Sequence, residues 1–156
     1  WGPTEVEQLS ADLSLAKGPW RVIVGHRPPI SGHPQLSRMV ARASEKSGRV
    51  VHAYLAGHVH VLAAIPGIAP EPALTAIAGS GSHARRQQDT EYRIEEPDFI
   101  VAKLGFIRLD VIGEPPEDRL RLTFLQSPRS AALTFLGNTL LARYEIEKNG
   151  SVARTR

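Results

Sequence analysis

Residues 50–61 read VVHAYLAGHVHV, and the rest of the chain is interpreted from this stretch. An apolar run over residues 50–55 ends at Gly57, and His58 and His60 follow it. Glycine allows the backbone to leave a strand sharply, and imidazoles held at the end of a rigid strand can share a metal site. Taken alone, the stretch fits equally well with two polar residues that happen to end a strand.

A second copy of this arrangement lies upstream, where residues 20–33 read WRVIVGHRPPISGH. An apolar run over residues 20–24 ends at Gly25, and His26 follows it. Between the two copies, apolar residues recur with the spacing of one helical face. They are Leu36, Met39, Val40 and Ala43. The sequence therefore predicts a strand, a helix and a second strand.

Two apolar strands joined by a helix form a crossover unit, in which the strands run parallel. The carboxyl ends of parallel strands meet at one edge of the sheet, and open α/β sheets bind their ligands there. We therefore expect His26, His58 and His60 to converge on that edge. His52, inside the second strand, is expected to pack within the sheet rather than to bind a metal.

These motifs resemble those of the calcineurin-like metallophosphoesterases, and most closely the purple-acid-phosphatase-like branch. The resemblance rests on GHRP at residues 25–28, followed by SGH at 31–33, and on GHVH at 57–60. The segments LTAIAGSGS at 74–82 and GFIRLDV at 105–111 read like the same branch. The resemblance covers roughly the first two-thirds of the chain clearly, and the last third only as a run of strands.

The resemblance implies a site with two metal ions, drawn from Fe, Zn and Mn. By position, His26 and His58 correspond to ligands of one ion, and His60 to a ligand of the other. His33 corresponds to the residue that protonates the leaving alcohol, a task that suits a pKa near neutrality. Arg27 stands where the family more often has His or Tyr. It is either a residue that binds the substrate phosphate or a solvated loop arginine.

The acidic ligands of that family are missing from this sequence. The Asp-x-His pair, the aspartate of Gly-Asp and the asparagine of Gly-Asn-His have no counterpart here. Neutral imidazoles alone do not neutralise two cations. We therefore expect residues 1–148 to be the C-terminal half of a metallophosphoesterase domain, followed by a frayed tail over residues 149–156. The N-terminal half is expected in preceding sequence or in a second chain.

The expected fold class is α/β, as half of a four-layer αββα sandwich. Parallel strands with crossover helices come first, and antiparallel strands follow. A surface loop is expected over residues 83–97, and the later strands are expected over 99–104, 106–112, 119–125 and 140–148. The expected function of the completed domain is the hydrolysis of phosphate esters. This chain alone is expected to be inactive.

Two other functions stay open. The first is a non-catalytic, phosphoesterase-like module of a larger assembly, in which a partner covers the apolar face that a half-sandwich exposes. The second is a single zinc ion held by His26, His58 and His60 with water as the fourth ligand.

Composition excludes several other classes of protein. The chain has 156 residues and no cysteine, which rules out disulfides and thiolate metal ligands. Its formal charge is only +3, its arginines are scattered and it lacks nucleic-acid-binding motifs, so no nucleic-acid partner is expected. No run of residues is long and apolar enough to cross a bilayer.

Overall fold

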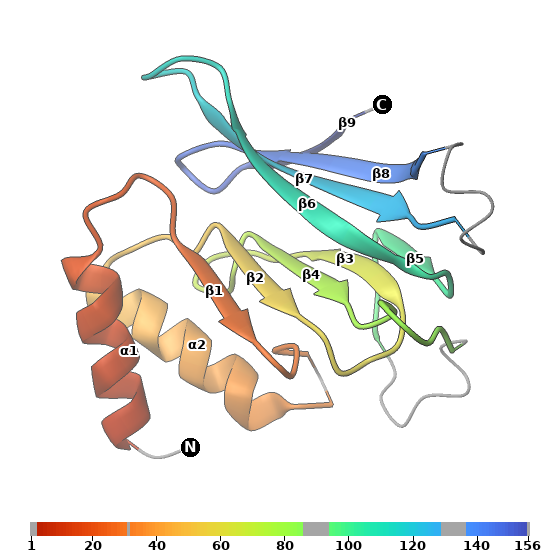
Figure 1. The fold of residues 1–156 in the computed structure, drawn as a ribbon. Helices are drawn as coiled ribbons and strands as arrows, with labels where there is room; N and C mark the ends of the chain where they lie inside the picture. The colour runs from red at the N-terminus through yellow and green to blue at the C-terminus, as the bar shows by residue number, and fades with distance from the viewer. Residues whose placement is uncertain (1–2, 31, 86–93, 129–136, 156) are drawn as a thin grey trace.

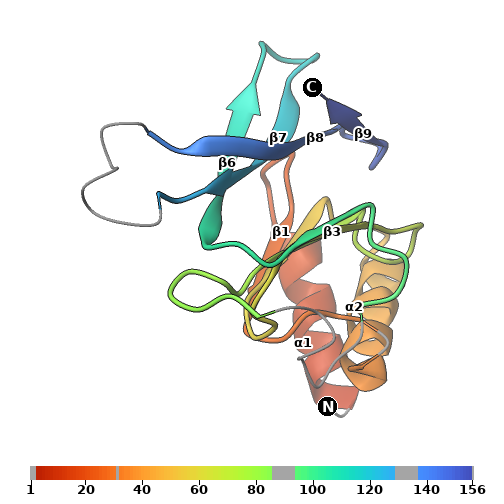
Figure 2. The ribbon, with the colours of Figure 1, turned by 90° about the vertical axis from the view of Figure 1, so that its right-hand side faces the viewer.

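The computed structural model describes residues 3–30, 32–85, 94–128 and 137–155. Its elements, in chain order, are α1 (Pro3–Leu15), β1 (Val22–Gly25), α2 (Pro34–Ser47), β2 (Ala53–Ala56), β3 (Leu62–Pro66), β4 (Leu74–Ala78), β5 (Phe99–Val101), β6 (Gly105–Ile112), β7 (Arg119–Gln126), β8 (Thr139–Ile146) and β9 (Val152–Thr155). They form three layers, with α1 and α2 on one face of a mixed sheet and an antiparallel sheet on its other face (Figure 1 and Figure 2).

The first sheet confirms the crossover unit that the sequence predicts. Its strand order is β1-β2-β4-β3-β5, and β1, β2 and β4 run parallel. The helix between β1 and β2 is α2, and the buried residues along it include the predicted apolar face of Leu36, Met39, Val40 and Ala43. Gly48 follows the helix with φ 63°, the left-handed conformation that commonly closes a helix.

β3 was not predicted from the sequence, because no element was assigned to the residues that follow the GHVH motif. In the structure Leu62–Pro66 form a strand that lies antiparallel to both β4 and β5. A short, wholly apolar run such as VLAAI at 61–65 has no period that distinguishes a strand from a buried helical segment. The turn through the GHVH motif reverses the chain, and this reversal makes Leu62–Pro66 a strand antiparallel to β4.

The chain changes sheets between β5 and β6. β5 ends at Val101, earlier than the predicted strand over 99–104, and β6 begins at Gly105. A Cβ atom on Gly105 would lie 2.1 Å from the carbonyl oxygen of Leu125 on β7. Two backbones therefore meet at a distance that only glycine permits. The expected loop over 83–97 lies partly outside the described residues, which omit 86–93.

The second sheet is antiparallel throughout, with strand order β6-β7-β8-β9. The frayed tail expected over residues 149–156 is instead mostly ordered, because β9 pairs with β8. Gly150 has φ 89°, its N–H donates to the carbonyl oxygen of Glu147, and the Ser151 N–H donates to Asn149 Oδ1 at 2.8 Å. Asn-Gly is a strong hairpin signal, and this turn returns the chain to the sheet.

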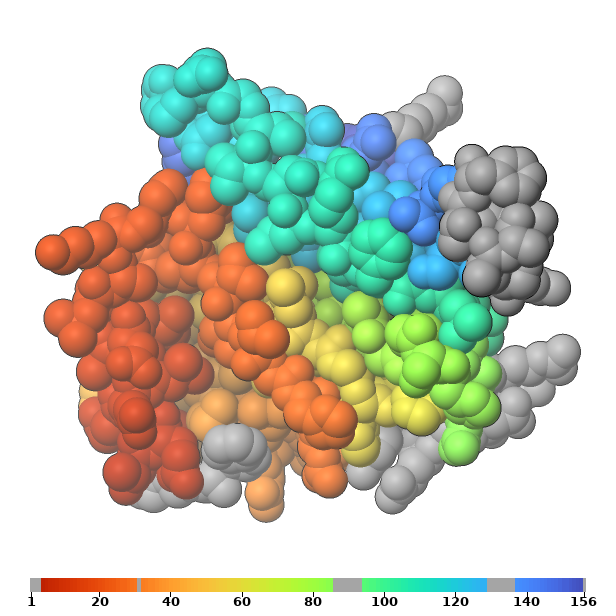
Figure 3. Space-filling model, in the orientation of Figure 1, coloured from red at the N-terminus to blue at the C-terminus, as the bar shows by residue number. Residues whose placement is uncertain are grey.

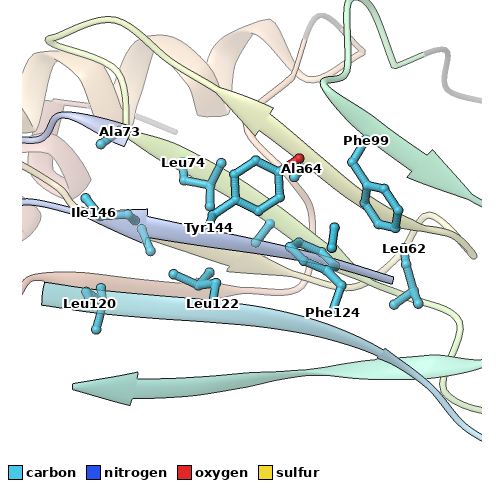
Figure 4. Close-up of a cluster of buried hydrophobic side chains, with 13 residues drawn as sticks. Leu62, Ala64, Ala73, Leu74, Phe99, Leu120, Leu122, Phe124, Tyr144 and Ile146 are labelled. Carbon is cyan, nitrogen blue, oxygen red and sulfur yellow. The ribbon is translucent and has the colours of Figure 1, made fainter. Parts of the chain in front are cut away.

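The main hydrophobic core lies between the two sheets (Figure 4). Alternate residues of β7, Leu120, Leu122 and Phe124, point inward toward side chains of the first sheet. The Phe124 ring packs 5.2 Å from the Phe99 ring and 5.8 Å from the Tyr144 ring, measured between centroids. This core holds the two sheets face to face and so fixes the layer that carries the histidines.

The helices cover the opposite face of the first sheet. A second apolar cluster lies there, and α1 contributes Val6 and Leu9 at its margin. The two helices are also linked at their surface by an ion pair between Lys46 and Glu7. Within the described ranges, neither helix is long and apolar enough to span a membrane.

Truncating the inter-sheet core is expected to destabilise the fold. Leu122 is fully buried, and Leu122→Ala should lower the free energy of unfolding by about 2–5 kcal/mol, because lost apolar contact and an unfilled cavity add together. Ile68 is 86% exposed, so Ile68→Ala is a matched control that should change it by less than about 0.5 kcal/mol. Urea denaturation measures both, and equal values for the two variants would contradict this description of the core.

Candidate functional site

His26 and His58 meet at the carboxyl edge of the parallel strands. The register of β1 and β2 aligns Gly25 with Ala56, so each histidine follows closely on a paired strand end. The pairing continues one step further, because the Gly57 N–H donates to the His26 carbonyl oxygen at 3.1 Å. As a result His26 Nε2 lies 3.1 Å from His58 Nδ1, with ring centroids 4.9 Å apart.

The backbone at His58 adopts a conformation unusual for a residue with a side chain. Its φ is +61°, and the neighbouring bonds are tight, from Val59 N–H to the Gly57 carbonyl oxygen and from Val61 N–H to the Val59 carbonyl oxygen, both 2.7 Å. The sequence suggested that Gly57 would provide the sharp exit, whereas the left-handed residue is the histidine itself. Such positions cost about 1–3 kcal/mol and concentrate at functional sites.

The other two predicted histidines have different neighbours. His33 is the N-cap residue of α2, and its ring centroid lies 5.7 Å from that of His58. The His60 ring instead packs 5.6 Å from the ring of His83. His60 Nδ1 is buried and has no hydrogen-bond partner among the described residues. The structure thus groups His26, His58 and His33, and places His60 beside His83.

The described residues offer imidazole nitrogens but no complete metal cage. No group of three or more His, Cys, Asp or Glu side chains in this part of the chain is arranged to hold a metal ion. Two nitrogen ligands of one tetrahedral ion, each about 2.1 Å from it, are roughly 3.4 Å apart. The separation of 3.1 Å between His26 and His58 is close to that value, so these two side chains fit the role of paired ligands.

A pocket of about 560 Å³ opens beside these histidines. It lies between the end of β1 and the first turn of α2, and its walls include His26, His33 and the predicted substrate residue Arg27, whose side chain is exposed. Tyr54, from β2, also lines it. The pocket therefore brings His26 and His33 together with Arg27, the predicted site residue that carries a permanent charge.

His52 is a core residue, as predicted. It is buried, its Nδ1 accepts a hydrogen bond from the Arg21 N–H at 3.1 Å, and its Nε2 lies 3.1 Å from the Lys148 carbonyl oxygen. Its ring also packs edge-on against Trp20 at 4.9 Å. Because Nδ1 accepts a bond, Nε2 carries the proton, and both nitrogens are occupied with structural partners.

Sequence analysis did not single out Tyr54 at this edge, and it assigned His83 to the surface loop over 83–97. Tyr54 looked like an ordinary strand residue, and nothing in its neighbourhood in the sequence indicates that it faces a pocket. His83 did carry a signal, because GSGSH at 79–83 is a third case of an apolar strand followed by glycine and histidine. Since β4 is parallel to β2, that pattern places His83 at the same edge.

The arrangement of a mixed sheet, an antiparallel sheet and two helices is consistent with part of a phosphoesterase-like fold. Among solved structures, the chain is similar to "Structure of PhoD", with a TM-score of 0.69 and 14% sequence identity. PhoD is alkaline phosphatase D, a metallophosphoesterase-like enzyme. The match covers 99% of this chain but 35% of that chain, so this chain spans about a third of its length. No family description and no curated protein matches the sequence. At this identity the likeness shows the fold alone.

The structural role of His52 makes stability depend on pH. Burial lowers the pKa of His52 below its ordinary 6.5, and the nearby Arg21 charge lowers it further, against the raising effect of the Lys148 carbonyl. Between that lowered pKa and 6.5 the unfolded chain binds more protons. The free energy of unfolding should therefore fall as the pH drops below 6.5, by up to about 1.4 kcal/mol per pH unit from this group.

Urea denaturation of His52→Gln between pH 7.5 and 5 measures this contribution. The variant should show a flatter dependence of stability on pH than the unsubstituted chain, whatever its absolute stability. His83→Gln removes an exposed histidine and should keep the original slope. Parallel pH profiles for His52→Gln and the unsubstituted chain would show that His52 is not the titrating group.

Proposed function

We propose that this chain is the C-terminal part of a metal-dependent phosphoesterase, acid phosphatase-like, that hydrolyses phosphate esters at a dinuclear metal site. The observation that carries the proposal is the 3.1 Å approach of His26 Nε2 to His58 Nδ1, at the ends of adjacent parallel strands in a phosphoesterase-like fold. The purple-acid-phosphatase-like branch rests on the sequence motifs alone. Acidic ligands come from a completing half outside these residues.

The histidines divide between two ions. His26 and His58 hold one ion, and His60, whose buried Nδ1 lacks a hydrogen-bond partner among the described residues, turns to the second. Fe, Zn and Mn all accept imidazole together with carboxylate ligands. Bound ions of this kind act as Lewis acids on phosphate oxygens and lower the pKa of water.

Two further side chains serve the substrate. His33 lies close to His58 and at the pocket wall, where its imidazole can protonate the leaving alcohol. The Arg27 guanidinium is exposed at the same pocket, where it can hold phosphate oxygens through paired N–H groups.

The need for a completing half is supported by an uncovered side of the sandwich. β1 and β6 are edge strands of the two sheets, and both lie toward the viewer in Figure 1 and Figure 3. Leu109 and Val111 on β6 pair with the buried residues Leu122 and Leu120, so they share the inner face of their sheet, yet Val111 is 59% exposed. Val24 on β1 is 76% exposed.

Exposed apolar side chains on the inner faces of two adjacent edges are expected where further strands belong. Strands added beside β1 and β6 would extend both sheets and bury these side chains. The share of the PhoD chain that this chain does not match, with 35% covered, is compatible with such a half. The completing half is either preceding sequence or a second chain.

A non-catalytic, phosphoesterase-like module is the second candidate. It is favoured by one observation, which is that the described residues contain no cluster of three metal-ligating side chains. The two candidates differ in what the completing half brings. If the completing half places carboxylate ligands at the histidine edge, the protein is an enzyme. If it does not, the protein is a structural subunit.

Loss of the paired histidines is expected to abolish metal-dependent activity. In the completed protein loaded with zinc or manganese, His58→Ala should lower hydrolysis of p-nitrophenyl phosphate by more than about 100-fold, because losing a direct ligand exceeds the roughly 10–100-fold effect of an outer partner. Metal content and turnover are the two measurements. His52→Gln, at a buried structural histidine, is the matched control and should retain metal. A completed protein that binds no metal would exclude the enzyme and leave the structural module.

A charged side chain on the uncovered edge is expected to block binding of the completing half. Val111→Lys should reduce binding of the completing half by at least tenfold, because burying an unpaired ammonium group is strongly unfavourable. Ile68→Lys introduces the same charge at a position that is 86% exposed and should leave that binding unchanged. Calorimetric titration or co-purification measures both variants. Equal binding by the two would place the interface elsewhere.

A further inference from the structure

The pocket beside His26 and His33 is lined by basic and neutral polar side chains among the described residues. In the part of the chain that the structure describes, its polar side chains are those of His26, Arg27, His33, Gln35 and Tyr54, and none of them is an aspartate or glutamate. Every group there that can carry charge at neutral pH is therefore basic. A volume of about 560 Å³ falls within the roughly 300–1,000 Å³ of small-molecule sites. The pocket is matched to an anionic ligand.

Tyr54 brings a buried donor to this pocket. The residue is only 3% exposed, and its ring belongs to the apolar cluster under the helices. Its hydroxyl oxygen lies 2.1 Å from the point where a Cβ atom on Gly25 would stand, so only glycine at position 25 leaves room for it. No hydrogen bond of this hydroxyl to another described residue is found, although the pocket lies beside it.

The Tyr54 hydroxyl oxygen stays accessible from the pocket although most of the residue is buried, so a ligand or water there can accept its hydrogen bond. Burial also raises the pKa of Tyr54, which keeps the phenol protonated at neutral pH. Its hydroxyl is then available as a hydrogen-bond donor. A donor at the wall of a basic pocket suits an oxyanion.

The first turn of α2 adds donors on the opposite wall. This 14-residue helix begins at Pro34, which has no N–H, and its N-cap residue His33 makes no side-chain hydrogen bond to the turn. The backbone N–H groups of Gln35 and Leu36 are therefore not capped by that side chain, and both residues line the pocket. The positive end of the helix dipole also lies there, and it favours an anion.

We propose that this pocket binds a second anionic group, carried by the alcohol part of the phosphate ester, and that the Tyr54 hydroxyl donates a hydrogen bond to it. Arg27, which holds the phosphate in the proposed function, adds positive charge to the same pocket, and the first turn of α2 supplies backbone donors to the second anion. His33, the proposed acid, lines this pocket and its ring centroid lies 5.7 Å from that of His58, so the group bound there is assigned to the leaving alcohol. This substrate class rests on the proposed function. The oxyanion site itself does not.

The oxyanion site is tested without metal. The full chain, kept in EDTA, is titrated with inorganic phosphate by calorimetry, and Tyr54→Phe should raise the dissociation constant about tenfold by removing one oxygen atom only. Tyr144→Phe is the matched control, since that tyrosine lies in the inter-sheet core and bonds to Asp98. It should leave the dissociation constant unchanged. Absence of phosphate binding, or equal binding by Tyr54→Phe and the unsubstituted chain, overturns the proposal.

The substrate class is tested in the completed, metal-loaded protein. Tyr54→Phe should raise the KM for 2-phosphoglycolate, which carries a carboxylate on its alcohol part, about tenfold with little change in kcat. The KM for p-nitrophenyl phosphate, which has no second anion, should stay the same. Equal effects on the two substrates would overturn the substrate class. Turnover of neither substrate would instead refute the proposed function, and the metal-free titration would still decide whether the oxyanion site exists.

Discussion

The parallel pairing of β1 with β2 is the constraint on which the rest of the structure depends. Its register places Gly25 opposite Ala56, and the bond from the Gly57 N–H to the His26 carbonyl oxygen extends it beyond the strands. A slip of one residue would displace one imidazole by about 3.3 Å, enough to separate the pair. Parallel pairing also requires a crossover, so α2 begins at the same edge. The histidine pair and the pocket therefore follow from one topological feature.

Two local positions at this edge oppose ordinary backbone and packing preferences. His58 keeps a left-handed backbone, and Gly25 leaves a space that only the Tyr54 hydroxyl enters. Neither arrangement belongs to the inter-sheet core, which is formed by other residues, although the Tyr54 ring packs in the apolar cluster under the helices. Conformations of this kind persist only where the surrounding structure determines them strongly. The buried inter-sheet core provides that determination, so the rigid part of the fold stabilises the strained part.

Sequence reasoning recovered the elements that have a clear period or a fixed turn residue. The α2 face and the inward residues of β7 could be read directly from the sequence. Of the predicted convergence of His26, His58 and His60, the structure pairs His26 with His58 and places the His60 ring beside His83. β3 could not be recovered, since a wholly apolar run has no period and its direction depends on the turn before it. The place of Tyr54 at the pocket could not be predicted either, because it depends on a contact with Gly25, which is distant in the sequence.

The position of β1 explains why the site cannot be complete within these residues under the proposed function. β1 carries His26 and is also the edge strand of its sheet, so only one of its two sides is paired, with β2. A parallel strand added on the other side would lie about 4.8 Å away and end at the same edge. Residues following it would stand next to His26, as His58 does on the paired side. Under the proposed function, one strand added beside β1 would account for both the exposed apolar edge and the carboxylates that these residues lack.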